Sequence, residues 1–390
     1  MIAHPIRLAM VMTNFDELGV QRVVLNLYKH FDRRRIDPVL VVWQRKGKVA
    51  SFLPDDAVVY ETDPDLPWPR FLFRLPRYVR ILKELAPQVI LSFVPGTNVS
   101  MALVKPLLPN SPVFIACEHA FLTRAFALNE YAGPFRLIYQ SFLRPMYNDV
   151  CDRVVMTAES GRDDAVHNWH IERGKIEVIY NPQDLTDLRK RAAESVEDDP
   201  WFSSPSVPTF IAAGRLAPQK GFDLLIEAFA RLRKQRSARL AILGGGPLEE
   251  QLKGQVTAAG LDHDVRFLGF QLNHLKYIKR ATCFVLSSRW EAMPMVVGET
   301  MAIGTPIVSF DCPSGPRELL DGGRCGFLVP DRDVEALAQT LGHVIDRPEE
   351  AAAKAERALE RVQLFDVDRV TRQYEDLIET ELERKLAAGK

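Results

Sequence analysis

Residues 209–234 read TFIAAGRLAPQKGFDLLIEAFARLRK, and the fold can be inferred from this stretch. Its start, residues 209–213, is apolar and typical of a buried parallel strand, whereas apolar residues recur at helical spacing over residues 223–234. A loop with two glycines and two cations joins the two parts. A strand, a loop and a helix in this order indicate an α/β unit, in which ligands bind beyond the carboxyl end of the strand.

The same alternation continues along the chain in both directions. Further strands are expected at residues 6–12, 38–43, 89–93, 113–117 and 154–157, and after the quoted stretch at residues 240–243, 266–269, 283–287 and 306–310. A helix is expected at residues 20–28, and charged terminal helices from about residue 334. We therefore predict an α/β chain with two similar Rossmann-like domains that face one another across a cleft.

The predicted boundaries follow from a break in this pattern. Residues 183–206 are polar and charged and contain proline, which is typical of a connection between domains. The sequence thus predicts an N-terminal domain over residues 1–182, a linker over 183–206, a C-terminal domain over 207–365 and a C-terminal helix over 366–390.

Composition excludes several classes of protein. The 390 residues are 47% hydrophobic and 26% charged, as expected for two globular domains, each with its own core. Fifty basic and 51 acidic residues give a net charge of −1, so nothing favours nucleic acid as a partner. Five widely spaced cysteines are typical of reduced structural thiols. The apolar stretch near the N-terminus is too short for a signal or a spanning segment, so a cytoplasmic protein is expected.

The loop over residues 214–221 carries the first candidate site residues, Arg215 and Lys220. A planar guanidinium and a point cation suit the adjacent phosphoryl groups of a diphosphate. The helix that follows adds the positive end of its dipole. The alternative is that both side chains are ordinary solvated cations of a loop.

A second loop offers two carboxylates in the segment WEAMPMVVGETMAIGTPIV, residues 290–308. Glu291 lies where the strand 283–287 ends, and Glu299 lies about two turns into the following helix. One carboxylate could contact a sugar ring while the other accepts hydrogen bonds from ribose hydroxyls. The backbone N–H groups of Met295 and Val296 would face phosphates at the helix start. The alternative is an amphipathic helix with an exposed N-terminal carboxylate.

Three motifs in this order resemble the C-terminal domain of glycosyltransferase family 4: GRLAPQKGFDLLIEAF (214–229), LGGGPLEEQL (243–252) and the E-x7-E pattern of residues 291–299. The segment CPSGPRELLDGGRCGFLVPDRD (312–333) is similar to the usual sequel in that family. The resemblance is strong over residues 208–338 and weak in the N-terminal half. It implies the GT-B fold, with a C-terminal helix that packs back on the N-terminal domain, and a nucleotide-sugar donor. Ala292, where the family often has glycine, and Pro294, which lacks an N–H, are departures.

The resemblance also assigns roles to individual residues. Glu291 would bind the donor sugar and Glu299 the ribose, while Arg215 and Lys220 would stabilise the departing diphosphate. Gly19 would approach the donor phosphates and His119 the transferred sugar, although a plain strand–helix turn and a loop histidine bonded to backbone are the alternatives. Backbone groups around Phe270 would recognise the base.

Metal is not expected to take part in the reaction. The D-x-D triplets at residues 63–65, 262–264 and 331–333 are explained by chance in a chain with 51 acidic residues, and Asp333 sits at an expected helix start, where aspartate caps. The two cations of the 214–221 loop can replace a divalent ion beside a diphosphate. We expect no cofactor and metal-independent transfer.

Two basic, aromatic stretches of the N-terminal half suggest an anionic membrane surface as a partner. Residues 66–83 include Arg70, Arg74, Arg77, Arg80 and Lys83; residues 121–147 include Arg124, Arg136, Arg144, Phe135, Tyr139, Phe142 and Tyr147. Each cation near such a surface contributes about 1 kcal/mol. The alternative is amphipathic helices with solvated arginines. Peripheral association with the inner face of the membrane is therefore a hypothesis.

The resemblance implies a retaining glycosyltransferase that uses a nucleotide-sugar and acts on a saccharide or a lipid-linked acceptor. The GPRELL segment, residues 315–320, is similar to enzymes of surface polysaccharide and glycolipid assembly and favours a UDP-sugar. No protein nucleophile is placed for a covalent intermediate, so a donor phosphate oxygen is expected to take the acceptor proton. Two alternatives stay open: a sugar-nucleotide epimerase of the same fold, and an inactive protein that binds nucleotide-sugars.

Overall fold

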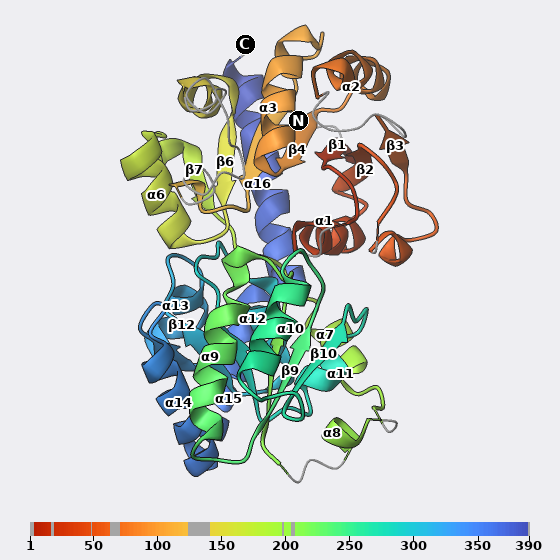
Figure 1. Cartoon of the computed structure of the whole chain (residues 1–390). Coiled ribbons are helices and arrows are strands. Elements are labelled where there is room, and N and C mark those ends of the chain that lie inside the picture. The colour runs from red at the N-terminus through yellow and green to blue at the C-terminus, as the bar shows by residue number, and fades with distance from the viewer. Residues whose placement is uncertain are drawn as a thin grey trace. The chain divides into compact units, whose positions relative to one another are not determined.

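The computed structural model describes residues 4–16, 19–47, 49–62, 71–123, 141–196, 199–203 and 207–388, and Figure 1 shows their helices and strands. The chain forms two compact units: unit 1 is Met1–Pro182 together with Val367–Lys390, and unit 2 is Gln183–Asp366. Each unit contains one parallel sheet with helices, so the predicted α/β class with two Rossmann-like domains is confirmed.

The sheet of unit 1 has the strand order β3-β2-β1-β4-β5-β6-β7, and every described pairing is parallel. Its inner strands are continuous apolar runs because helices cover both faces, which leaves few positions for polar side chains. The strands are β1 (Ile6–Val11), β2 (Ile36–Val42), β3 (Val59–Glu61), β4 (Val89–Phe93), β5 (Val113–Glu118), β6 (Arg153–Met156) and β7 (Ile176–Val178).

The helices of unit 1 pack in two groups. Residues of α2 and α3 share one apolar core with alternate residues of the strands, such as Ile90 and Phe114. Helix α16 contacts α1 and β5. The helices are α1 (Gly19–His30), α2 (Phe71–Leu85), α3 (Pro95–Val104), α6 (Glu159–Trp169) and α16 (Val367–Ala388).

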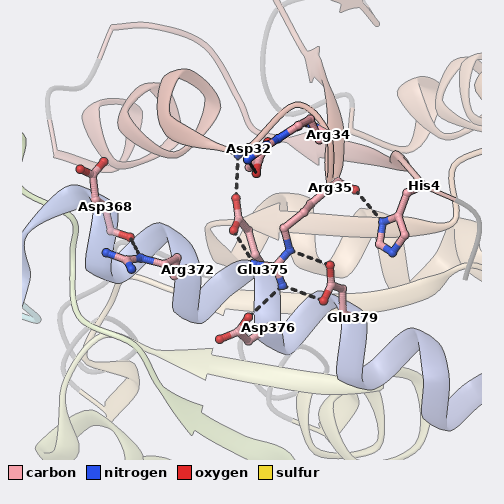
Figure 2. Close-up of polar contacts among 9 residues, drawn as sticks. All are labelled: His4, Asp32, Arg34, Arg35, Asp368, Arg372, Glu375, Asp376 and Glu379. Carbon is pink, nitrogen blue, oxygen red and sulfur yellow. Dashed lines mark hydrogen bonds and ion pairs between the residues drawn. The ribbon is translucent and has the colours of Figure 1, made fainter.

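Helix α16 comes from the C-terminal end of the chain and is bound to unit 1 by a group of charges (Figure 2). Arg35, in the turn just before β2, donates to Glu375, Asp376 and Glu379 at distances of 2.6–2.9 Å, and all three carboxylates belong to α16. Glu375 also accepts from the Asp32 N–H at 2.7 Å and is 3% exposed. The expectation that the C-terminal helix packs on the N-terminal domain is therefore confirmed.

The sheet of unit 2 has the order β10-β9-β8-β11-β12-β13 and is also parallel in its described pairings. Its strands are β8 (Thr209–Ala213), β9 (Arg239–Leu243), β10 (Val265–Gly269), β11 (Cys283–Leu286), β12 (Ile307–Phe310) and β13 (Phe327–Val329). Phe210 and Leu240 pack with α9, α10 and α14 in one core, while their neighbours Ile211 and Ala241, which point to the other face, are fully buried too. Both faces of this sheet are thus covered.

The helices of unit 2 are α7 (Leu185–Ala192), α8 (Pro200–Ser203), α9 (Phe222–Arg233), α10 (Glu249–Ala258), α11 (Leu275–Ile278), α12 (Met295–Ile303), α13 (Pro316–Leu319), α14 (Val334–Asp346) and α15 (Pro348–Arg361). The segment 183–206, expected as a linker, belongs instead to unit 2 and contains α7 and α8. Leu185, Leu188 and Ala192 bury one face of α7, and this helix contacts α11 and α12. The polar composition had hidden this narrow apolar stripe.

Two general features concern membranes and thiols. Within the part of the chain that the structure describes, no helix combines the length and apolarity that crossing a membrane requires. All five cysteines are described, and each is buried with a free thiol. Burial raises the pKa of every one of these thiols, which disfavours the nucleophilic thiolate.

Replacing Arg35 by alanine should destabilise unit 1. The change leaves the buried Glu375 without its cation, and we expect the free energy of unfolding to fall by about 2 kcal/mol, less than for a fully buried pair because Arg35 is partly exposed. Urea denaturation followed by circular dichroism measures the effect. The neighbouring Arg34 is the matched control, since its side chain is 90% exposed, and Arg34→Ala should leave the denaturation midpoint unchanged. Equal midpoints for both variants would contradict the anchoring role of Arg35.

Candidate functional site

The carboxyl edge of the unit 2 sheet brings together the loops that carry the predicted site residues. Strand order reverses between β8 and β11, so the chain leaves these two neighbouring strands toward opposite sides of the sheet. Ligands of open α/β sheets bind at such a switch point, because the diverging loops leave a crevice between them. Arg215 and Lys220 follow β8, and Glu291 follows β11.

Lys220 and Glu291 form an ion pair at the centre of this edge. The Lys220 Nζ lies 2.6 Å from the Glu291 Oε1, and Glu291 is only 5% exposed. Ser288 donates to the same oxygen at 2.6 Å. The Lys220 ammonium has three donors, so it can hold Glu291 and contact a further anion at the same time. Ser288 was not predicted, although its position three residues before Glu291 places it in the same loop.

Several hydrogen bonds join the two loops on either side of this pair. Ser287 Oγ donates to the Lys220 carbonyl at 2.9 Å, and the Arg289 N–H donates to the Gln219 carbonyl at 2.8 Å. The Arg289 guanidinium also binds the Asp223 carboxylate at 2.6 and 2.9 Å, and holds the pKa of Asp223 below its usual value against the effect of burial. The separation of Lys220 and Glu291 is therefore set by the loops and not by the pair alone.

Glycine is required where these loops approach each other most closely. Gly221 has a φ of 61°, and a Cβ added there would lie 2.1 Å from the Ser287 carbonyl oxygen. Gly244, at the start of the glycine run, has a φ of 132°, and a Cβ there would lie 1.8 Å from the Gly214 carbonyl oxygen. Both the positive φ and the lack of space exclude other residues. The glycine run thus positions the 214–221 loop from its other side.

The remaining predicted residues of unit 2 lie in loops or at a helix start that follow strands of the same sheet. Arg215 is exposed; its carbonyl accepts from the Ala217 N–H at 2.8 Å, and its side chain forms no ion pair with the residues that the structure describes. Met295 and Val296 are the first two residues of α12, where N–H groups have no partner within the helix. Phe270 follows directly after β10 and is half-buried.

Glu299 has a partner that the sequence analysis did not identify. The His274 Nε2 lies 2.6 Å from the Glu299 Oε2, and the two residues are 9% and 3% exposed. His274 comes immediately before α11, three residues after Gln271. The sequence did offer one signal for this contact, because His274 follows the loop that was expected to contact the base. The pairing was not recognisable because His274 and Glu299 are 25 residues apart in the sequence.

The two predicted residues of unit 1 lie at the carboxyl edge of its own sheet. Gly19 is the first residue of α1, and a Cβ added there would meet nothing within 4 Å, so packing within the chain does not require glycine. His119 directly follows β5, and both of its ring nitrogens are buried. Burial lowers the pKa of His119 to about 4, although the Asn181 side chain opposes the shift. The ring is therefore neutral near pH 7 and can donate a hydrogen bond, but it cannot supply a positive charge.

A buried carboxyl group next to His119 was not predicted. Glu118 is 1% exposed and accepts hydrogen bonds from Tyr147 and from Asn98, the latter at 2.6 Å. Burial raises the pKa of Glu118 to about 7, more than these two hydrogen bonds lower it. The residue is thus about half protonated near neutral pH.

The structure limits what the D-x-D triplets and basic stretches can do. Asp333 caps α14 by accepting from the Ala336 N–H at 2.9 Å, as expected. Among the described residues, no cluster of three or more His, Cys, Asp or Glu side chains could hold a metal ion. Arg74 is 3% exposed and lies 4.1 Å from the Trp43 ring centroid, so it does not face solvent. The triplet 63–65 and the predicted residues Arg70, Arg124, Phe135, Arg136 and Tyr139 lie outside the described part.

Comparison with known proteins identifies the family and the fold of the chain. Residues 19–187 match the family model Glycosyltransferase Family 4, and residues 196–361 match Glycosyl transferases group 1. An uncharacterised glycosyltransferase of Methanocaldococcus jannaschii is 27% identical over 80% of this chain and 84% of its own length. A Campylobacter jejuni relative is 28% identical over 61% of this chain and 63% of its own length; its name is N-acetylgalactosamine-N,N'-diacetylbacillosaminyl-diphospho-undecaprenol 4-alpha-N-acetylgalactosaminyltransferase. The crystal structure of Anabaena HepE with UDP and glucose has a TM-score of 0.80 at 18% identity, covering 96% of this chain and 100% of HepE.

The fold and the two family models define a glycosyltransferase of the GT-B class. Both halves match family models, and the chain belongs to glycosyltransferase family 4. The resemblance inferred from the three C-terminal motifs is thereby confirmed for the family and for the fold.

The pKa of Glu118 predicts a dependence of stability on pH. Because the pKa of Glu118 in the folded protein, about 7, lies above the ordinary glutamate value of 4.5, the stabilisation is complete below pH 4.5 and is lost as the pH rises through 7. We expect the free energy of unfolding of the wild type, relative to Glu118→Gln, to fall by roughly 3 kcal/mol over this range. Urea denaturation at a series of pH values measures it. Glu177→Gln, which replaces an exposed glutamate of the same unit, is measured in parallel as the control for the substitution itself. A difference between wild type and Glu118→Gln that is constant with pH would refute the assignment.

Proposed function

We propose that the chain is a retaining hexosyltransferase that moves a sugar from a nucleotide-sugar, with UDP-sugars favoured, to a hydroxyl group of a saccharide or lipid-linked acceptor. The reaction would belong to the assembly of surface polysaccharides or glycolipids. The observation that carries this proposal is the ion pair between the partly buried Lys220 and the buried Glu291 at the switch point of the unit 2 sheet, with the exposed Arg215 on the same loop as Lys220.

The diphosphate of the donor is assigned to the cations of this edge. Arg215 is exposed and can offer its fork of donors to one phosphoryl group, while Lys220 offers the donors that Glu291 does not use. The N–H groups at the start of α12 can approach the same phosphates. Together these groups would stabilise the negative charge that develops on the diphosphate as it leaves.

The donor sugar and the nucleoside are assigned to the two carboxylates. Lys220 and Ser288 both bind the Oε1 of Glu291, which leaves Oε2 to accept a hydrogen bond from a sugar hydroxyl. Glu299 would accept hydrogen bonds from the ribose, and backbone groups near Phe270 would contact the base. Gly19 and His119 of unit 1 are assigned to the donor phosphates and to the transferred sugar, where a neutral imidazole can donate a hydrogen bond.

The chemical step would be a substitution on one face of the sugar. The acceptor oxygen forms a bond to the anomeric carbon while the bond from that carbon to the diphosphate oxygen breaks. The electron pair of the broken bond stays on the departing diphosphate. An oxygen of this group takes the acceptor proton. Attack from the face that the leaving group occupied retains the configuration. Neither a metal nor a covalent intermediate is needed in this scheme.

The similar proteins support the choice of donor and acceptor. HepE, which shares the fold, was solved with UDP and also with UDP-glucose. The name of the C. jejuni relative describes transfer to a saccharide carried on diphospho-undecaprenol. These ligands are consistent with a UDP-sugar donor and a lipid-linked acceptor for this chain.

The proposal is tested by thermal shift with UDP-, GDP- and ADP-sugars, without metal and then with Mg²⁺. A ligand that binds only the folded state raises the melting temperature. We expect one nucleotide-sugar to do so without metal, and Arg215→Ala to weaken its binding by roughly 10- to 100-fold through loss of charge-assisted hydrogen bonds. Lys234→Ala is the control, since Lys234 is an exposed cation at the far end of α9. Folded protein with no shift from any nucleotide-sugar would refute the proposal.

A second part of the proposal places an anionic membrane surface against α2. Its described residues Arg77, Arg80 and Lys83 are exposed and recur at three-residue spacing, so they lie on one side of the helix. Arg77 also donates to the Thr62 carbonyl at 3.1 Å. In the other basic stretch, Tyr147 is buried and donates to Glu118, so its side chain is not available to a membrane surface. The membrane contact is thus assigned to α2 and not to Tyr147.

Charge reversal on α2 should reduce binding to anionic vesicles. The Arg80→Glu, Lys83→Glu double variant reverses two charges and lowers the net charge near the surface by four units, and we expect binding to phosphatidylglycerol vesicles at low salt to fall at least tenfold. Vesicle cosedimentation measures it. The control reverses the exposed Arg369 and Arg372 of α16 to glutamate, with the same change in net charge. A wild type that stays in solution with such vesicles would rule out the membrane contact.

A further inference from the structure

The contact between His274 and Glu299 has the geometry of a fixed support. The His274 Nε2 and the Glu299 Oε2 are 2.6 Å apart, and the two side chains are 11% and 3% exposed. When the carboxylate is ionised, the Nε2 of His274 must carry the proton that it donates. A short, charge-assisted hydrogen bond of this kind restricts rotation of the carboxylate about its last bond.

The backbone that carries His274 is itself held in place. In the loop before α11, the Leu272 carbonyl accepts from the Arg191 guanidinium at 2.9 Å, and Asn273 donates to the Arg191 carbonyl at 2.8 Å. Arg191 belongs to α7, which contacts both α11 and α12. His274 and Glu299 are therefore attached to a group of three helices that contact one another. The loop cannot shift without breaking these contacts.

We propose that His274 is a positioning residue that holds the Glu299 carboxylate ready to accept hydrogen bonds from the ribose hydroxyls of a nucleoside diphosphate. This inference rests on the proposed function, which places the ribose at Glu299. Pre-organisation of this kind strengthens binding because the ligand does not have to order the carboxylate itself. The effect of His274 is expected only for the part of the ligand that Glu299 contacts, the ribose. A general contribution of His274 to the stability of the fold would instead affect the binding of all ligands.

The experiment compares ligands that differ in one ribose hydroxyl. Isothermal titration calorimetry with UDP, 2′-deoxy-UDP and 3′-deoxy-UDP is carried out on wild type, His274→Phe and His274→Gln, and repeated with GDP and ADP and their deoxy forms. His274→Phe keeps a ring but loses the donor, whereas His274→Gln keeps an N–H near the position of Nε2. The control His263→Phe replaces an exposed histidine of the same unit. Melting temperatures show whether each variant is folded.

We expect wild type to prefer the full ribose by about tenfold, the value of one such hydrogen bond. His274→Phe should lose most of this preference by weakening the ribonucleotide and not the deoxy form, and His274→Gln should restore it. In a Glu299→Gln background, the effect of His274→Phe on this preference should largely disappear, because the two residues act as one unit.

Two results overturn the proposal, and they differ from failure of the proposed function. If folded His274→Phe weakens ribo- and deoxynucleotides equally, or neither, then His274 has no positioning role toward the ribose. If His274→Phe does not fold, His274→Gln decides. A folded His274→Gln variant that lacks the wild-type preference for the ribonucleotide leads to the same conclusion. If wild type binds no nucleoside diphosphate, or binds ribose and deoxyribose forms equally, the assignment of the ribose to Glu299 fails, and the role of His274 fails with it.

Discussion

A buried carboxylate needs a cation, and at the carboxyl edge of unit 2 this need is met across two loops. Glu291 is 5% exposed, and loss of Lys220 would leave its charge uncompensated. The loop after β8 must therefore stay at a constant distance from the loop after β11. Three contacts hold the two loops at this distance. They are the Arg289–Asp223 pair, the hydrogen bond from Ser287 to the Lys220 carbonyl and the close approach at Gly221. The exposed Arg215 depends on the same loop for its position.

The two units treat charge differently at their carboxyl edges. In unit 2 the carboxylates are paired, Glu291 with a lysine and Glu299 with a histidine. In unit 1, burial raises the pKa of Glu118 to about 7 and lowers that of His119 to about 4, so both side chains are driven toward their neutral forms. The first kind of edge keeps a cation, Lys220, that can bind an anionic group. The second kind can exchange neutral hydrogen bonds with hydroxyl groups.

Sequence patterns predicted the inner strands of both sheets because these strands are long apolar runs; residues 89–93 and 209–213 match the structure at both ends. The edge strands β3, β7 and β13 were not predicted, because each has only three residues and depends on a neighbouring strand for its hydrogen bonds. The site residues Lys220 and Glu291 were recognisable from motif spacing and strand ends. His274, Ser288 and Glu118 were not, because their roles arise from burial and from contacts between loops, which no local pattern encodes.

The position of α16 also has a consequence for how the chain acquires its structure during synthesis. Unit 2 is one continuous segment, and its ends meet where the Gln183 N–H donates to the Phe365 carbonyl at 2.8 Å. Unit 1 is interrupted by it and needs residues that the ribosome adds later, among them the buried Tyr374, Ile378 and Glu381. Unit 2 can therefore complete its core first, although unit 1 begins earlier. Until α16 emerges, the surface of α1 and β5 that it covers is open to chaperones or to unwanted association.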